Sequence, residues 1–71
     1  MIRIEIHEWS RTKALNWKQP SLYAAKKFLK ERGAKLRIKK HIVTDLYQNS
    51  WIQREYVDNS GTRFLLRIAE T

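Results

Sequence analysis

The sequence has 71 residues, of which 42% are hydrophobic and 11% aromatic, and a formal net charge of +8 from fifteen Lys and Arg against seven Asp and Glu. This length suits one small domain, residues 1–71, and leaves no room for a separate catalytic domain. Without cysteine there is no disulfide, thiol nucleophile or thiolate metal ligand, and no apolar run approaches the ~20 residues of a membrane-spanning helix. These features predict a cytoplasmic basic protein.

The basic residues are concentrated in one part of the sequence. Positions 10–41 hold eleven Lys and Arg and a single acid, Glu31, whereas the segments on either side each carry a net charge of −1. The run KKFLKERGAKLRIKK, residues 26–40, alone contains eight basic residues. Such an asymmetric charge favours a polyanionic partner.

The first segment, 1–9, alternates between apolar and polar residues. Ile2, Ile4 and Ile6 recur with period two, which predicts a strand with these side chains on one face. The polar and basic segment 10–19 that follows is either a long loop or a turn leading into a short strand near 14–18. We expect a partly ordered loop. Because ten irregular residues are long for a compact domain, either structure makes this segment a candidate for function.

A helix is predicted to begin after Pro20, with Ser21 as its N-cap, and to end at Gly33. At 100° per residue, its apolar side chains form one compact stripe, made of Leu22, Ala25, Phe28 and Leu29. The helix lysines, Lys26, Lys27 and Lys30, lie largely away from that stripe. Simple solvation explains them adequately.

The pattern changes from helical to alternating after Gly33. Three apolar residues share one side of the predicted strand, namely Leu36, Ile38 and Ile42. The basic residues share the other side, namely Lys35, Arg37, Lys39 and His41, while Lys40 is a discordant member of the apolar row. Residues 44–50 are interpreted as the end of this strand and a turn.

Two further apolar runs, WIQREYV and RFLLRIA, flank the turn sequence DNSG at 58–61. Asp first and Gly fourth suit a type I turn in which Gly61 is left-handed, as in three-residue hairpin loops. Pairing residue 58 with 62 sets Tyr56 opposite Phe64 and Ile52 opposite Ile68, so that the apolar rows agree. The sequence therefore predicts a hairpin with a defined register.

Together these elements predict an α+β domain: a small antiparallel-rich sheet of three to four strands with one helix packed on one face, in the order β-α-β-β-β. The core is expected to consist of the apolar side chains between the helix and the sheet: Ile2, Ile4, Ile6, Leu22, Ala25, Phe28, Leu29, Leu36, Ile38, Ile42, Ile52, Tyr56, Phe64, Leu66 and Ile68.

The other face of the sheet is expected to be exposed to solvent. Consecutive outward cations on one strand repel one another unless Glu5 or Glu55 lies beside them, so they indicate an anionic partner. Clustered Lys and Arg bind the phosphates of DNA or RNA, and an exposed Trp stacks on an unpaired base. We therefore predict a non-enzymatic nucleic-acid-binding domain whose contact residues lie on this face and the adjoining loop: Trp9, Arg11, Lys13, Trp17, Lys18, Lys35, Arg37, Lys39, His41, Arg63 and Arg67.

Other functions are compatible with the same composition. A small inhibitor or adaptor could dock on an acidic surface of another protein, because charge steers both kinds of association. An exposed edge strand also leaves a homodimer open. A small ribonuclease would need acid-base groups, and His7 and His41 are candidates, although no catalytic spacing surrounds them. No cofactor or metal is expected, because two His without a close carboxylate pair fall short of a usual ligand set and there is no Gly-rich loop.

Overall fold

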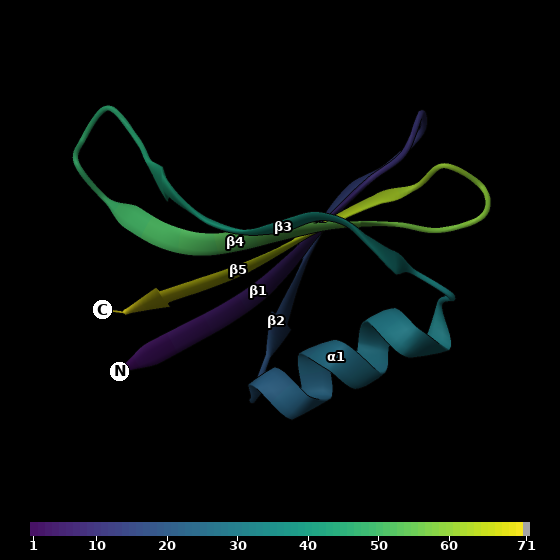
Figure 1. The fold of residues 1–71 in the computed structure, drawn as a ribbon, viewed down its shortest axis with the longest axis horizontal. Coiled ribbons are helices and arrows are strands. Elements are labelled where there is room, and N and C mark those ends of the chain that lie inside the picture. Colours follow the sequence, from purple (N-terminus) through teal and green to yellow (C-terminus); the bar gives the residue numbers. More distant parts are fainter. Residues whose placement is uncertain (71) are drawn as a thin grey trace.

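The computed structural model describes residues 1–70 and contains one helix beside a five-stranded sheet (Figure 1). The strand order is β2-β1-β5-β4-β3, and every neighbouring pair is antiparallel. The elements are β1 Ile2–Trp9, β2 Ala14–Gln19, α1 Leu22–Glu31, β3 Lys35–Thr44, β4 Ser50–Val57 and β5 Arg63–Glu70. The α+β class is therefore confirmed, with five strands in place of the three to four expected.

The additional strand is β2, which the sequence left as the less favoured alternative to a loop. Ser10 makes the turn that precedes it: its amide donates to the Lys13 carbonyl at 2.9 Å and its Oγ accepts from the Lys13 amide at 3.1 Å. The ladder then sets Trp17 opposite Ile6 on β1. Pairing with β1 supplies backbone partners that a ten-residue loop would lack, which is why β2 is a strand despite its polar composition.

The helix begins and ends as predicted. Ser21 is extended, and its Oγ accepts a hydrogen bond from the Ala24 amide at 3.1 Å. Gly33 has a φ of +68°, and its amide donates to the Lys30 carbonyl at 3.0 Å. The Ala34 amide donates to the Leu29 carbonyl at 3.0 Å, which completes a Schellman motif.

The β4–β5 hairpin also has its predicted register, with Tyr56 opposite Phe64 and Ile52 opposite Ile68. The Asp58 amide donates to the Thr62 carbonyl at 3.1 Å, and Gly61 has a φ of +85°. The segment between β3 and β4 is the predicted strand end and turn. Both turns are closed by an aspartate carboxylate that accepts backbone amides.

The core lies between α1 and the central strands β1 and β5, and its buried members are Ile4, Ile6, Ala25, Leu29, Phe64 and Leu66. Four residues expected in the core are exposed instead: Ile2 by 67%, Leu36 by 52%, Ile38 by 44% and Ile42 by 75%. The reason is that the helix does not extend over all five strands. It packs on β1 and β2, while the β3–β4 hairpin extends away from it (Figure 1).

Irregularities in β3 change which of its side chains share a face. The register shifts twice, so that Ile38 lies opposite Glu55 and His41 lies opposite Gln53. Each shift adds one residue to β3 and reverses the alternation beyond it. Ile38 therefore shares a face with Glu55, and Lys39 leaves the row of outward cations in which it was predicted. The discordant Lys40 is explained by the second shift, which places it beside His41.

Over residues 1–70, no helix combines the length and the apolarity needed to cross a membrane.

Candidate nucleic-acid interface

The sheet face opposite α1, here called the open face, carries side chains in rows that cross the strands. In one row Glu5 of β1 lies opposite Arg67 of β5, and Arg67 opposite Gln53 of β4. In the last row Trp9 lies opposite Arg63, and Val57 opposite Lys35. The open face is defined by the following residues: Arg3, Glu5, His7, Trp9, Ala14, Asn16, Lys18, Lys35, Arg37, Ile38, Lys40, His41, Val43, Trp51, Gln53, Glu55, Val57, Arg63, Leu65, Arg67 and Ala69.

One carboxylate on this face, Glu5, is held by three side chains. Arg3 Nε lies 3.2 Å from one oxygen, and His7 Nε2 and Asn16 Nδ2 lie 3.1 and 3.2 Å from the other. Burial acts to raise the pKa of Glu5, but the hydrogen bonds from Asn16 and His7 and the charge of Arg3 outweigh it and hold that pKa below its ordinary value. Glu5 is therefore a stable anion that offsets the charge of Arg3.

The second carboxylate, Glu55, bridges the two neighbouring strands. Its side chain is buried, with the residue 6% exposed, and its oxygens lie 3.4 Å from both Arg37 on β3 and Arg63 on β5. The negative charge of Glu55 thus offsets the repulsion between the neighbouring cations Arg37 and Arg63. Two of the predicted contact residues, Arg37 and Arg63, thus already have an acidic partner within the fold.

Arg67 differs from these arginines because its partner is neutral. Its Nε donates to Gln53 Oε1 at 3.2 Å, and Trp51 Nε1 donates to the same oxygen at 3.0 Å. The guanidinium carbon lies 5.0 Å from the centre of the Trp51 ring, within the range of a cation–π contact. Among residues 1–70, no carboxylate lies within ion-pair distance of this half-buried guanidinium.

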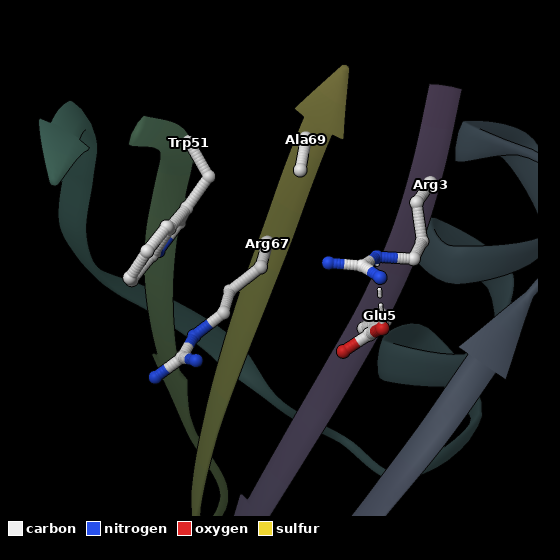
Figure 2. Close-up of a pocket in the computed structure, with 5 residues that line it drawn as sticks. All are labelled: Arg3, Glu5, Trp51, Arg67 and Ala69. Carbon is white, nitrogen blue, oxygen red and sulfur yellow. Dashed lines mark ion pairs between the residues drawn. The ribbon is translucent and has the colours of Figure 1, made fainter. Parts of the chain in front are cut away.

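A small hollow lies beside Arg67 (Figure 2). It has a volume of about 90 Å³, and Arg3, Glu5, Trp51, Arg67 and Ala69 line it. In Figure 2, Ala69 lies on β5 between Trp51 on β4 and Arg3 on β1, and the Arg67 side chain extends from the same strand toward the indole. At a share of ~30 Å³ for each water molecule, the hollow has room for about three waters or for a small oxyanion group.

Of the remaining predicted residues, Lys18 lies opposite Glu5 beside the hollow, and most of the others lie toward the other end of the sheet. Trp9 is 52% exposed on the open face, and Lys18 and Lys35 lie on strands at or near its two edges. Arg11 lies in the β1–β2 turn, close to the β4–β5 turn, and Lys13 belongs to the same β1–β2 turn. The structure therefore brings most of the predicted set to the open face and the turn beside it.

Trp17 and Lys39 are the two exceptions. Trp17 lies on the helix side, where its ring centre is 5.6 Å from that of Phe28, and the Arg32 guanidinium lies 3.6 Å from the Phe28 centre. Its indole Nε1 donates to Glu8 at 3.1 Å. Trp17 thus packs against the helix side and does not face the open side on which it was predicted, and Lys39 lies on the helix-side face because of the register shifts.

His7 and His41 are not brought together. His7 lies on β1 and His41 on β3, and β5 and β4 separate these strands in the sheet. At ~4.8 Å between neighbouring strands, the two backbones are about 14 Å apart. In the described part of the chain, no group of three or more His, Cys, Asp or Glu is arranged to hold a metal ion.

Three residues around the hollow were missed as site residues: Arg3, Trp51 and Gln53. The signal for Gln53 was present in the predicted hairpin register, because pairing Ile52 with Ile68 also sets Gln53 opposite Arg67. That Arg3 lies beside Ala69 could not be predicted, because it depends on the pairing of β1 with β5, which are far apart in the sequence.

No protein-family model, curated protein or solved structure matches this chain. A function is therefore inferred from the geometry and charge of the open face.

Proposed function

We propose that the chain is a non-enzymatic nucleic-acid-binding domain that contacts its partner through the open face and the adjoining β1–β2 turn. The observation that carries this proposal is Arg67. A half-buried guanidinium that is fixed by Gln53 and Trp51, without a carboxylate partner in residues 1–70, is preorganised for an external anion.

Phosphate is the anion that this arrangement suits best. Guanidinium groups bind phosphate oxygens through paired N–H donors, and of the two that line the hollow, Arg67 is the one that is not paired with Glu5. Lys18, opposite Glu5, supplies further positive charge beside the hollow, and Lys35, Arg11 and Lys13 extend the positive charge to the other end of the open face. A partner with many phosphates would use all of these groups together.

The exposed indole of Trp9 favours single-stranded over double-stranded nucleic acid. A base in a duplex hides both of its faces against its neighbours, whereas an unpaired base offers a face for stacking. Trp9 lies opposite Arg63 on the same face as the hollow, so one strand can contact an aromatic ring and a phosphate site on one surface. We therefore propose single-stranded RNA or DNA as the partner.

Fluorescence anisotropy with labelled single strands and duplexes tests this function. If about five phosphates are contacted, log K should fall with log salt with a slope of about −3.5 for a single strand and about −4.5 for a duplex. Single strands should bind more tightly than duplexes of equal length. Absence of binding to either form at low salt would refute the proposal.

A matched pair of variants locates the site. Arg67→Gln and Lys27→Gln each remove one positive charge, the first beside the hollow and the second on the outer surface of α1. Arg67→Gln is expected to weaken binding about tenfold, and Lys27→Gln by no more than about twofold, because only the first removes a fixed phosphate ligand. The reverse ranking would move the interface to the helix.

Docking on an acidic protein surface is a second candidate, and one observation favours it. Large apolar side chains are exposed on the β3–β4 hairpin, including Ile42, Leu46 and Tyr47. Nucleic-acid binding explains the cations but gives no reason for these exposed apolar side chains.

A further inference from the structure

The face of the sheet that α1 packs on is only partly covered. On the β3–β4 half of this face, called here the vacant half, the alternation places the following residues: Leu36, Lys39, Ile42, Ile52, Arg54 and Tyr56. Ile42 and Leu36 are mostly exposed, whereas Ile52 and Tyr56 are half-buried. α1 contacts β1 and β2, and in Figure 1 the turn that joins β3 to β4 lies on the opposite side of the view from α1.

The dimensions of the elements show what would fit there. Five strands at ~4.8 Å spacing span about 19 Å, and a helix with its side chains is about 10 Å across. One helix therefore covers about half of such a sheet. The vacant half has the width of one further helix lying beside α1 at a usual interaxial distance of 8–10 Å.

The charge of the vacant half indicates the chemistry of that helix. Lys39 and Arg54 lie among its apolar residues, and neither has an ion-pair partner in residues 1–70. The whole of β3 carries Lys35, Arg37, Lys39 and Lys40 and no acid. A helix that combines an apolar stripe with flanking Glu or Asp would bury the aliphatic side chains and pair with these cations.

A second copy of the chain fits this surface poorly. Its own α1 has already buried its apolar stripe through Ala25 and Leu29, so it has no free helix to offer. Stacking two vacant halves would place Lys39 and Arg54 against the same cations of the partner copy, in two chains that each carry +8. Strand addition at the β3 edge is opposed by the two register shifts, which interrupt a regular ladder.

We propose that the vacant half is a docking surface for an acidic amphipathic helix of a partner protein, which would lie beside α1 and complete the second layer of the domain. This site is separate from the open face, because the two lie on opposite sides of the sheet. A partner can therefore be bound there whether or not nucleic acid occupies the open face.

The probe for this site is a stapled helical peptide of about 18 residues with Leu at positions i, i+3, i+4 and i+7 and Glu at the flanking positions. In amide and methyl NMR spectra, its addition is expected to shift Leu36, Ile42 and Ile52, while Trp51 and Ala69 on the open face stay unchanged. A peptide with Lys in place of each Glu is expected to bind at least about tenfold more weakly, because it meets Lys39 and Arg54.

Two variants make the test specific. Ile42→Ser removes an exposed apolar contact and is expected to weaken the acidic peptide about tenfold with an unchanged thermal midpoint. Lys39→Glu should weaken the acidic peptide and strengthen the basic one, whereas Lys27→Glu, the same charge change on the outer side of α1, should alter both by less than about twofold.

Three outcomes would overturn the proposal. The first is equal affinity for the acidic and basic peptides. The second is peptide-induced shifts confined to the open face or to the lysines of α1. The third is concentration-dependent dimerisation in sedimentation equilibrium that Ile42→Ser abolishes, which would assign the vacant half to a second copy. None of these outcomes depends on nucleic-acid binding, so they leave the test of the open face intact.

Discussion

Arg63 and Arg67 lie four residues apart on β5, point to the same face and have different partners. Arg63 lies 3.4 Å from the buried carboxylate of Glu55, whereas Arg67 donates to the neutral amide of Gln53 and lies over Trp51. The first arginine is part of an ion pair within the fold, and the second is fixed without one. A count of basic residues therefore overstates the charge that a bound anion meets, because a cation that is already paired with a carboxylate of the fold is less available to that anion.

The largest effect on stability is expected from changing Glu55, the carboxylate that pairs with Arg63 but not with Arg67. Glu55→Gln keeps the shape of the side chain but removes the charge that Arg37 and Arg63 share, and it leaves two half-exposed guanidinium groups facing each other across β4. We expect the free energy of unfolding to fall by about 1–3 kcal/mol, measured by urea denaturation.

Glu31→Gln is the control for this change, because it alters an exposed acid at the end of α1 and should change the free energy of unfolding by less than about 0.5 kcal/mol. If the two variants were equally stable, Glu55 would contribute no more than an ordinary surface acid. Arg37 and Arg63 would then belong with Arg67 among the cations available to phosphate.

The next largest effect separates the two arginines directly. Arg67→Gln is expected to lower affinity for a single strand about tenfold with little change in stability, because its partner in the fold is neutral. Arg63→Gln is expected to lower affinity about threefold or less and to destabilise the fold, because it removes a partner of buried Glu55. Anisotropy and urea denaturation on the same samples measure both quantities. An equal loss of affinity in both variants would show that pairing with Glu55 does not prevent Arg63 from binding phosphate.

Trp9 gives a smaller effect that depends on the form of the nucleic acid. Trp9→Leu should weaken a single strand about fivefold, near the lower end of the range for one stacked base, and change duplex affinity by less than about twofold. Tyr23→Leu is the matched control, because Tyr23 is also an exposed ring but lies on α1, beside the helix lysines. A similar loss for single strand and duplex would mean that Trp9 acts without stacking on a base.

These comparisons also show which parts of the fold were predictable from sequence. Features set by residues close in the chain were predicted well: Ser21 caps α1, Gly33 ends it, and the turn ending at Gly61 fixes the β4–β5 register. The short strand β2 was underestimated, because its stability comes from pairing with β1 and not from its own apolar pattern.

Long-range packing accounts for the remaining differences. Ile42 belongs to an apolar row that alternates as expected for a core-facing strand. Its burial, however, also requires that α1 cover β3, and no local sequence pattern shows how far α1 extends over the sheet. The two register shifts in β3 moved Ile38 and Lys39 to the faces opposite those predicted. Most of the predicted contact residues share the open face, whereas the grouping of Arg67 with Gln53 and Trp51 depends on side-chain contacts across strands.

The smallest expected effect concerns the other carboxylate of the open face. The pKa of Glu5 in the folded chain lies below its ordinary value of 4.5, because the hydrogen bonds from Asn16 and His7 and the charge of Arg3 outweigh burial. Its ionised form therefore contributes stability that is fully present above about pH 4.5 and is lost as pH falls through the folded pKa. The difference in unfolding free energy between the parent chain and Glu5→Gln should be largest near pH 6 and should shrink toward pH 3.

Urea denaturation at a series of pH values measures this difference. Asp58 also has a lowered pKa, chiefly through its hydrogen bond with Ser60, but it is present in both chains, so its acid-dependent loss of stability cancels. A difference that stayed constant from pH 6 to 3 would mean that the fold does not prefer the ionised form of Glu5. Arg3 would then lack an effective acidic partner, and the hollow would have two available guanidinium groups in place of the single one at Arg67.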